Sequence, residues 1–222
     1  MREALAENVR RAEERVTAAC QRAGRPRSSV TLMAVTKTVG VEVAALLPEL
    51  GIADLGENRP QELWRKAEAI RSVRWHFIGH LQRNKVERTL PLCHRVHSAD
   101  SLRLLEALDA YGCDAYLEFN CSGEASKGGF APTDAEALVE PLSRLHRVRL
   151  VGLMTMAAPE DPEACRPAFR ELRRLRDLLR THLGPKHPMD GLSMGMSNDF
   201  EVAIEEGATI VRLGSLLFEG LP

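Results

Sequence analysis

Short apolar runs alternate with amphipathic segments along the chain. Apolar residues at spacings of three and four are typical of a helix packed on a core, and runs of four to eight β-branched or apolar residues indicate buried strands. The predicted strands are residues 30–35, 53–55, 74–78, 94–97, 115–119, 147–153, 191–193 and 209–213. The predicted helices are residues 2–23, 41–50, 59–70, 81–90, 100–111, 133–145, 161–182 and 199–206.

Eight strands that alternate with helices, without a break in composition, favour one closed (β/α)8 barrel of the TIM type. The barrel domain is expected to span residues 1–222 and to carry an extra helix at its N-terminus. A doubly wound parallel sheet of similar length is the alternative. In a barrel the carboxyl ends of the strands carry the chemistry, so polar and small residues that follow the strands become candidates. These candidates are Lys37, Glu57, Asn58, His80, Ser98, Asn120, Met154, Thr155, Ser197, Asn198, Gly214 and Ser215.

Charge and composition narrow the classes of partner. The 222 residues include 30 Lys+Arg and 31 Asp+Glu, and 5% are aromatic, which argues against a nucleic-acid-binding surface. No signal-peptide h-region or membrane-length apolar run occurs, so no membrane association is expected. The five cysteines form no CxxC pair, which argues against a disulfide framework and against a thiolate zinc site. We therefore expect a cytoplasmic protein.

Lys37 is the first candidate for covalent chemistry. Lysines number five against twenty-five arginines, and Lys37 directly follows an apolar strand. Partial desolvation of its ammonium at that place would favour the neutral amine that forms a Schiff base. The alternative is a lysine whose stem lies along the barrel mouth while its ammonium reaches water.

Two segments after the last two predicted strands suggest a phosphate site. Ser197 and Gly214 lie where (β/α)8 barrels commonly hold a phosphate with hydroxyl and backbone N–H groups. The alternative for Ser197 and Asn198 is a helix N-cap, with Glu201 completing a capping box. Arg212 lies inside an apolar strand, so it must pair with a carboxylate or with a ligand atom. A reactive lysine, a phosphate cradle and a buried arginine together describe a site for pyridoxal 5′-phosphate (PLP).

Six motifs resemble one family in order along most of the chain. They are AVTKT, GENRPQE, WHFIGHLQRNK, NCSGEASKGGF, VGLMTM and SMGMSNDFEVAIEEGATIVRLGS. The chain is therefore similar to the pyridoxal phosphate homeostasis protein family (the YggS/PROSC group), whose barrel is like the N-terminal domain of alanine racemase and is of PLP fold type III.

The resemblance implies a role for each matching residue. Lys37 would carry PLP as a Schiff base, and Arg212 would face the pyridine nitrogen. The phosphate would be held by Ser197, Gly214 and Ser215, and Met196 would also belong to the cofactor site. Asn58 and His80 would lie near the cofactor pocket. Ser215 stands where the family commonly has threonine, and this change keeps the hydroxyl. The tail, residues 218–222, departs from the family pattern.

The resemblance also implies a monomeric carrier rather than an efficient enzyme. The family is associated with buffering or delivery of PLP in vitamin B6 homeostasis, with apo PLP-dependent enzymes as possible transient recipients. A racemase needs a base on each face of the substrate, and neither Tyr111 nor Tyr116 is expected at the barrel mouth. An arginine at the ring nitrogen disfavours its protonation and weakens the ring as an electron sink. A low-activity PLP-dependent racemase or related enzyme is the alternative.

Three other features are expected to have no role in the site. The spacings of His76 with His80 and of His94 with His97 do not favour a metal site. Lys127 is expected to be a solvated loop residue, with a transient cofactor contact as the alternative. The arginines of helix 161–182, Arg173, Arg174 and Arg176, are expected to form a solvated face, with a protein-partner surface as the alternative.

Overall fold

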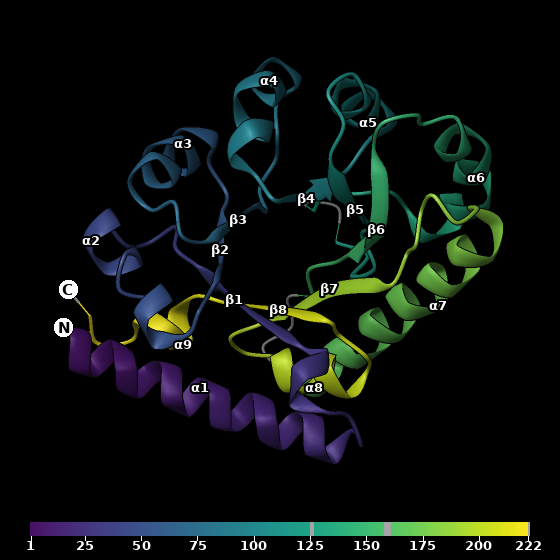
Figure 1. The fold of residues 1–222 in the computed structure, drawn as a ribbon. Helices are drawn as coiled ribbons and strands as arrows, with labels where there is room; N and C mark the ends of the chain where they lie inside the picture. Colours follow the sequence, from purple (N-terminus) through teal and green to yellow (C-terminus); the bar gives the residue numbers. More distant parts are fainter. Residues whose placement is uncertain (125–126, 158–160, 222) are drawn as a thin grey trace.

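The computed structural model describes residues 1–124, 127–157 and 161–221, and its eight parallel strands close into a barrel in the order β1 to β8. The strands are β1 (Thr31–Val35), β2 (Asp54–Glu57), β3 (Arg74–Phe77), β4 (Arg95–Ala99), β5 (Asp114–Glu118), β6 (Arg149–Met154), β7 (Gly191–Met196) and β8 (Ile210–Leu213). β8 pairs in parallel with β1, which confirms the barrel and excludes the open doubly wound sheet. Figure 1 shows the strands enclosed by the helices.

The predicted helices are present, but two of them are broken into short pieces. The longer helices are α1 (Arg2–Arg22), α3 (Pro60–Ala69), α5 (Leu102–Asp109), α6 (Ala135–Ser143), α7 (Arg166–His182) and α8 (Phe200–Glu205). In place of helix 41–50, α2 (Val41–Ala44) is followed by the 3₁₀ turn η2, which starts at Pro48. In place of helix 81–90, α4 (Val86–Thr89) lies between η3 (Arg83–Lys85) and η4 (Leu90–Leu92). The remaining 3₁₀ turns are η1 (Arg27–Ser29), η5 (Pro132–Asp134) and η6 (Pro162–Cys165).

The N-terminal helix α1 lies outside the ring of strands and packs against α8 and against a short helix that was not predicted, α9 (Ser215–Phe218) (Figure 1). Its buried stripe includes Leu5, Val9, Ala12 and Val16, at the spacing that places apolar side chains on one helix face. Figure 1 shows both chain termini at the same side of the molecule. Within the described residues, no helix is both long and apolar enough to cross a bilayer.

The barrel interior contains a small apolar cluster that is separate from the main core. The main core lies between the strands and the surrounding helices, whereas the inner cluster contains Met33, Tyr116, Val151, Met154 and Ile210. TIM barrel interiors are usually filled by bulky apolar side chains. Here polar side chains share that space, and they lead to the candidate site described below.

Strands β2, β4, β6 and β7 end later than the sequence predicted, and β7 shows why. β4 continues through Ser98 to Ala99, and β7 continues to Met196. Gly195 has a φ of 93°, in a region that favours glycine, and the register between β7 and β8 shifts between Ser193 and Met196. A Cβ at Gly195 would also lie 2.6 Å from the Ala203 side chain. The irregularity therefore requires glycine and directs the end of β7 toward the carboxyl end of the barrel.

Candidate functional site

A cavity of about 500 Å³ lies at the carboxyl ends of β1, β2, β3, β7 and β8. Its lining residues all come from the strand ends and from the loops that follow them. They are Val35, Lys37, Thr38, Asn58, Ile78, Gly79, Met156, Met196, Ser197, Asn198, Arg212, Gly214 and Ser215. None of these described lining residues carries a carboxylate, whereas Lys37 and Arg212 are cations. The cavity therefore suits an anionic ligand.

Lys37 lies two residues past the end of β1, where it lines the cavity and is exposed. The expected partial desolvation of its ammonium is therefore not seen, because the side chain stands at the open mouth. Asn58 follows the neighbouring strand β2, and the backbone of Gly79 lies tightly against it: a Cβ at Gly79 would lie 2.1 Å from the Asn58 carbonyl oxygen. This close approach holds the loops after β2 and β3 together.

Ser197 joins the loops that follow β7 and β8. Its hydroxyl oxygen accepts hydrogen bonds from the backbone N–H groups of Gly214, at 3.2 Å, and Leu216, at 3.3 Å. The N-cap interpretation is wrong, because α8 begins at Phe200 with Asp199 as its N-cap. Asp199 instead accepts a 2.6 Å bond from the N–H of Met196. Ser197 thus gathers backbone donors and its own hydroxyl at one place on the cavity wall.

Arg212 is buried in β8, with 4% of its surface exposed, and it lines the cavity floor. Its Nη1 donates to the carbonyl oxygen of Ser193 at 2.7 Å and to the Ser193 hydroxyl at 2.8 Å. Its Nη2 donates to the carbonyl oxygen of Thr155 at 2.9 Å. These acceptors are carbonyl and hydroxyl oxygens, and none of them is the carboxylate that was one of the two expected partners. Burial lowers the pKa of Arg212 to about 10, so the guanidinium stays charged at neutral pH.

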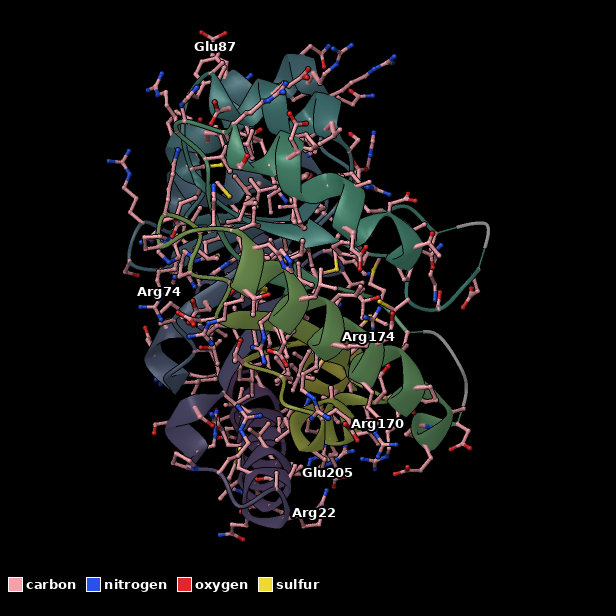
Figure 2. All side chains as sticks on the ribbon, turned by 90° about the vertical axis from the view of Figure 1, so that its right-hand side faces the viewer. Arg22, Arg74, Glu87, Arg170, Arg174 and Glu205 are labelled. Atoms are coloured by element: carbon pink, nitrogen blue, oxygen red, sulfur yellow. The ribbon has the colours of Figure 1, made fainter. Side chains whose placement is uncertain are left out.

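Beneath Arg212, four more polar side chains continue the hydrogen bonding through the barrel interior. Ser193 Oγ lies 2.8 Å from His97 Nδ1, and His97 Nε2 lies 2.9 Å from His76 Nδ1. His76 Nε2 lies 2.9 Å from a carboxylate oxygen of Asp54. At the far end Asp54 accepts two bonds from Arg74, whose side chain reaches the molecular surface (Figure 2). The four side chains that continue from Arg212 are all buried: Ser193, His97, His76 and Asp54.

A second buried polar group supports the loop that carries Lys37. Lys66 of α3 donates to the carbonyl oxygen of Thr36 at 2.7 Å and to the carboxylate of Glu57. The Thr36 hydroxyl donates to the same carboxylate at 2.7 Å. Lys66 and Glu57 are fully buried. These contacts tie the ends of β1 and β2 together directly beside Lys37 and Asn58.

At the mouth of the barrel, Glu118 ends β5 and is buried, with 7% of its surface exposed. Burial, with the nearby charge of Asp100, raises the pKa of Glu118 to about 7, although Arg212 and His80 act in the opposite direction. His80 itself is exposed and lies 2.9 Å from Asp100, Nδ1 to Oδ2. His80 does not line the cavity, because its ring pairs with Asp100 instead.

The structure thus brings together seven of the eight residues that the sequence analysis assigned to the cofactor site, all except His80. Lys37, Asn58, Met196, Ser197, Arg212, Gly214 and Ser215 all line the cavity. The sequence missed Thr38, Ile78, Gly79 and Met156 in the lining and the buried chain below it. A sign of that chain was present, because Asp54, His76 and His97 interrupt strands that are otherwise apolar.

Lys127 is not a solvated residue. Its ammonium donates to Glu124 at 2.8 Å and to the carbonyl oxygen of Met156 at 3.3 Å, and its side chain is 17% exposed. It therefore joins the loop after β5 to a residue of the cavity wall. The remainder of that loop, residues 125–126, lies outside the described part of the chain.

The last described residues of the chain are held by α1. Asn8 donates to the carbonyl oxygens of Leu217, at 3.0 Å, and Glu219, at 2.9 Å. Phe218 is buried. These bonds fix α9, and with it the Ser215 end of the cavity wall. Residue 222 lies outside the described range.

The arginines of α7 are paired with neighbouring acidic groups rather than free. Arg173 lies 3.3 Å from Glu206, and Arg174 donates to Glu171 at 2.9 Å. Arg176 donates to Asp177 at 2.6 Å. Figure 2 shows Arg170 and Arg174 along α7, with Glu205 and Arg22 close together below them. Such pairing gives a mixed-charge surface and does not support a basic partner-binding face.

The histidine spacings do not produce a metal site in the part of the chain that the structure describes. Over the described residues, no group of three or more His, Cys, Asp and Glu side chains is arranged to hold a metal ion. His76 and His97 bond to each other through ring nitrogens, and burial lowers the pKa of both. His94 lies edge-on to His76, at a centroid distance of 5.4 Å.

Comparison with known proteins places the chain in a family. The family model described as alanine racemase, N-terminal domain, matches residues 2–222. The pyridoxal phosphate homeostasis protein of Aquifex aeolicus (strain VF5) is 43% identical over 221 residues, covering 96% of this chain and 96% of that protein. A protein of the same name from Bos taurus is 34% identical, covering 95% of this chain and 85% of that protein.

Solved structures agree with these matches. The structure of PipY from Synechococcus elongatus PCC7942 with PLP bound has a TM-score of 0.78 and 31% identity, covering 93% of this chain and 99% of that one. Alanine racemase from Corynebacterium glutamicum has a TM-score of 0.75 at 18% identity, covering all of this chain and 63% of that one, which shows a shared fold.

Proposed function

The chain belongs to the alanine racemase N-terminal-domain family and to the pyridoxal phosphate homeostasis proteins within it, and we propose that it binds PLP in the cavity at the carboxyl end of the barrel. The bound cofactor would serve PLP homeostasis, through buffering or delivery. Residues 1–222 would act as one cofactor-binding domain. The observation that carries this proposal is the cavity itself, where a lysine, a buried arginine and a Ser197-centred group of donors meet.

The chemistry of the cavity fits each part of PLP. The hydroxyls of Ser197 and Ser215 line the cavity and are suitable donors for a phosphate. The N–H groups of Gly214 and Leu216 donate to the Ser197 oxygen and hold that hydroxyl in place. Val35, Ile78, Met156 and Met196 offer apolar surface for an aromatic ring. The described lining contains no carboxylate, so none of its side chains would repel the negative charge of the phosphate.

Lys37 would hold the cofactor covalently. Its amine would add to the aldehyde carbon of PLP, and loss of one water would leave a Schiff base. The open position of Lys37 at the cavity mouth supports this role, because an aldehyde can reach it from solvent. Asn58, which also lines the cavity, would orient the bound cofactor. Thr36 and Lys66 hold the backbone that presents Lys37.

Arg212 favours a carrier over an efficient enzyme. Two of its nitrogens bond to the protein, so its charge is fixed at the cavity floor. A fixed cation at the ring nitrogen opposes protonation of that nitrogen and weakens electron withdrawal by the ring. Tyr116 is buried in the inner cluster, and Tyr111 is exposed at the end of α5. Neither tyrosine supplies a second base at the cavity, which supports holding over racemisation.

The direct test is a spectrum followed by a map of the modified residue. Purified protein mixed with PLP should develop an imine absorbance band, and borohydride reduction should leave one pyridoxyl group on the peptide that contains Lys37. Lys37→Ala should abolish both, while Lys85→Ala should leave both unchanged. Absence of the band, or an adduct on another lysine, would refute the assignment.

A second assay separates the carrier from the enzyme. A carrier should bind PLP in a one-to-one ratio, show negligible turnover on amino acids and transfer PLP to an apo PLP-dependent enzyme. Saturable racemisation or transamination of one amino acid, lost in Lys37→Ala, would favour the alternative of a low-activity enzyme.

A further inference from the structure

The hydrogen-bonded side chains beneath the cavity run without interruption from Asp54 on β2 to Arg212 on β8. The links are Asp54 to His76 at 2.9 Å, His76 to His97 at 2.9 Å, His97 to Ser193 at 2.8 Å and Ser193 to Arg212 at 2.8 Å. Each side chain comes from a different strand of the barrel. Polar groups in such a core are costly unless all are satisfied, so a chain of this length needs a reason.

The Asp54 end fixes the direction of the bonds. A guanidinium can donate and cannot accept, so the Ser193 oxygen accepts from Arg212, and its hydroxyl hydrogen remains available for His97. At the other end an ionised Asp54 accepts and cannot donate, so His76 carries its proton on Nε2. Burial opposes the charge of Asp54, but Arg74 and His76 nevertheless hold its pKa below the ordinary value.

The two histidines complete the sequence consistently. Burial lowers the pKa of both rings, so each is neutral and carries one proton. Nδ1 of His76 then accepts from Nε2–H of His97, and Nδ1 of His97 accepts from the Ser193 hydroxyl. The direction set at Asp54 is compatible with Ser193 accepting from Arg212. All four links point one way, from Arg212 toward Asp54.

We propose that Ser193, His97, His76 and Asp54 are positioning residues, which hold Arg212 in one orientation as a fixed donor toward the ring nitrogen of the bound cofactor. This inference rests on the proposed function. Arg212 is fixed from below by Ser193 and from the side by the Thr155 carbonyl oxygen. Rotation of the guanidinium would break its hydrogen bond to Ser193 and so separate Arg212 from the side chains of His97, His76 and Asp54.

Groups packed around the chain favour this neutral, one-way state. Tyr116 of β5 stacks on the His97 ring at a centroid distance of 4.4 Å. The cations Arg95 and Arg212 both lower the pKa of His97, and Arg95 and Arg74 act likewise on His76. A second proton on either ring is thereby opposed from β4 and β8 as well as by burial.

The direction of the chain can be tested without cofactor. A long-range ¹H–¹⁵N correlation spectrum of the ligand-free protein at pH 7 should show His76 and His97 as neutral rings protonated on Nε2, assigned with His76→Gln and His97→Gln. Both should stay neutral when the pH is lowered to mildly acidic values, because burial lowers the pKa of both rings. A Nδ1-protonated or doubly protonated ring at either position at pH 7 would overturn the inference.

The positioning role is tested with PLP labelled with ¹⁵N in its ring. Ser193→Ala removes one oxygen atom from the chain and leaves the carbonyl acceptors of Arg212 in place. The variant should still form the Lys37 imine, but its ring ¹⁵N resonance should move toward that of a pyridine without a hydrogen bond. Ser143→Ala, which removes an exposed hydroxyl on α6, is the matched control and should give the wild-type resonance.

Failure of this inference and failure of the proposed function give different results. If wild-type protein binds no PLP, the proposed function fails, and the positioning role toward the cofactor fails with it, whatever the histidine spectra show. If PLP binds at Lys37 but Ser193→Ala leaves the ring ¹⁵N resonance unchanged, the proposed function stands and the positioning role is refuted.

Discussion

The ammonium of Lys66 donates a 2.7 Å hydrogen bond to the carbonyl oxygen of Thr36, the residue before Lys37. The same ammonium pairs with Glu57, the residue before Asn58. One buried cation thus fixes the backbone at the ends of two neighbouring strands, β1 and β2, beside the cavity. It also explains one of the five lysines in a chain that otherwise uses arginine, because the compact ammonium fits a fully buried place between two strand ends.

Replacing Lys66 should therefore damage both stability and cofactor binding. Lys66→Met leaves the Glu57 carboxylate buried without a cation, which is expected to cost about 3–5 kcal/mol of unfolding free energy. Chemical denaturation measures the loss. Lys85→Met is the control. The Lys85 ammonium lies over the Trp64 ring, 5.8 Å from its centroid, and the loss of this contact should cost below about 1 kcal/mol.

A double variant separates charge from packing at this place. Replacing both Glu57 and Lys66 with methionine removes the unpaired charge, so most of the stability lost in Lys66→Met should return. If the double variant is less stable than Lys66→Met, the loss comes from packing and the ion pair is not its cause.

Ser197→Ala should weaken phosphate recognition specifically. Loss of one hydroxyl donor to an anion is expected to cost about 1.5–3 kcal/mol, or roughly a 10- to 150-fold higher Kd for PLP. Pyridoxal, which has no phosphate, should bind Ser197→Ala and the wild type equally. Titration followed by imine absorbance measures both.

The control for this variant is Ser29→Ala, at the amino-terminal end of the barrel. Its hydroxyl bonds to the Pro26 carbonyl oxygen and is exposed, so affinity for PLP should not change. An equal loss of affinity for pyridoxal and PLP in Ser197→Ala would contradict the phosphate role and would indicate a general distortion of the loop after β7.

Asn8→Ala should loosen the end of the chain. The change removes two hydrogen bonds to the carbonyl oxygens of Leu217 and Glu219, for an expected loss of about 1–3 kcal/mol in unfolding free energy. Hydrogen exchange should rise in α9 more than in β8. Arg2→Ala, which removes an exposed ion pair between α1 and Glu49, should change stability by less than about 1 kcal/mol. Similar losses in the two variants would contradict the anchoring role of Asn8.

The barrel was predictable from the sequence because each strand is a local apolar run and the strands alternate with amphipathic helices. The gathering of Lys37, Ser197, Gly214 and Arg212 followed from that topology, since carboxyl ends of parallel strands meet at one end of a barrel. Strand ends were less predictable. β7 continues to Met196 because Gly195 adopts a φ that no local pattern specifies.

Pairing across the barrel could not be predicted in the same way. His97 and Ser193 are 96 residues apart, and their contact depends on the barrel interior, where β4 and β7 face each other without being neighbours. The orientation of His80 also depends on a partner, Asp100, that belongs to the next strand's loop. The burial of Glu118 could not be predicted either. Its raised pKa comes from that burial and from the nearby charge of Asp100.

Glu118 should make stability fall as pH rises through the weakly acidic range. The pKa of Glu118 is raised to about 7 in the folded protein against 4.5 for an ordinary glutamate, because burial disfavours the charge. Below pH 4.5 both states hold the proton, and between pH 4.5 and 7 the folded state holds more protons than the unfolded state. Stability must therefore decrease across that window and level off above it, by up to about 3 kcal/mol.

Glu118→Gln should abolish this decrease. The variant and the wild type should unfold with the same dependence on pH below 4.5, and the variant should become the more stable one as pH rises to 7 and above. Denaturant unfolding at closely spaced pH values from 4 to 9 measures the difference. Glu136→Gln, which changes an exposed glutamate of α6, should follow the wild-type curve. A difference between Glu118→Gln and the wild type that stays constant from pH 4 to 9 would show that folding does not shift the pKa of Glu118, and would contradict the effect of burial.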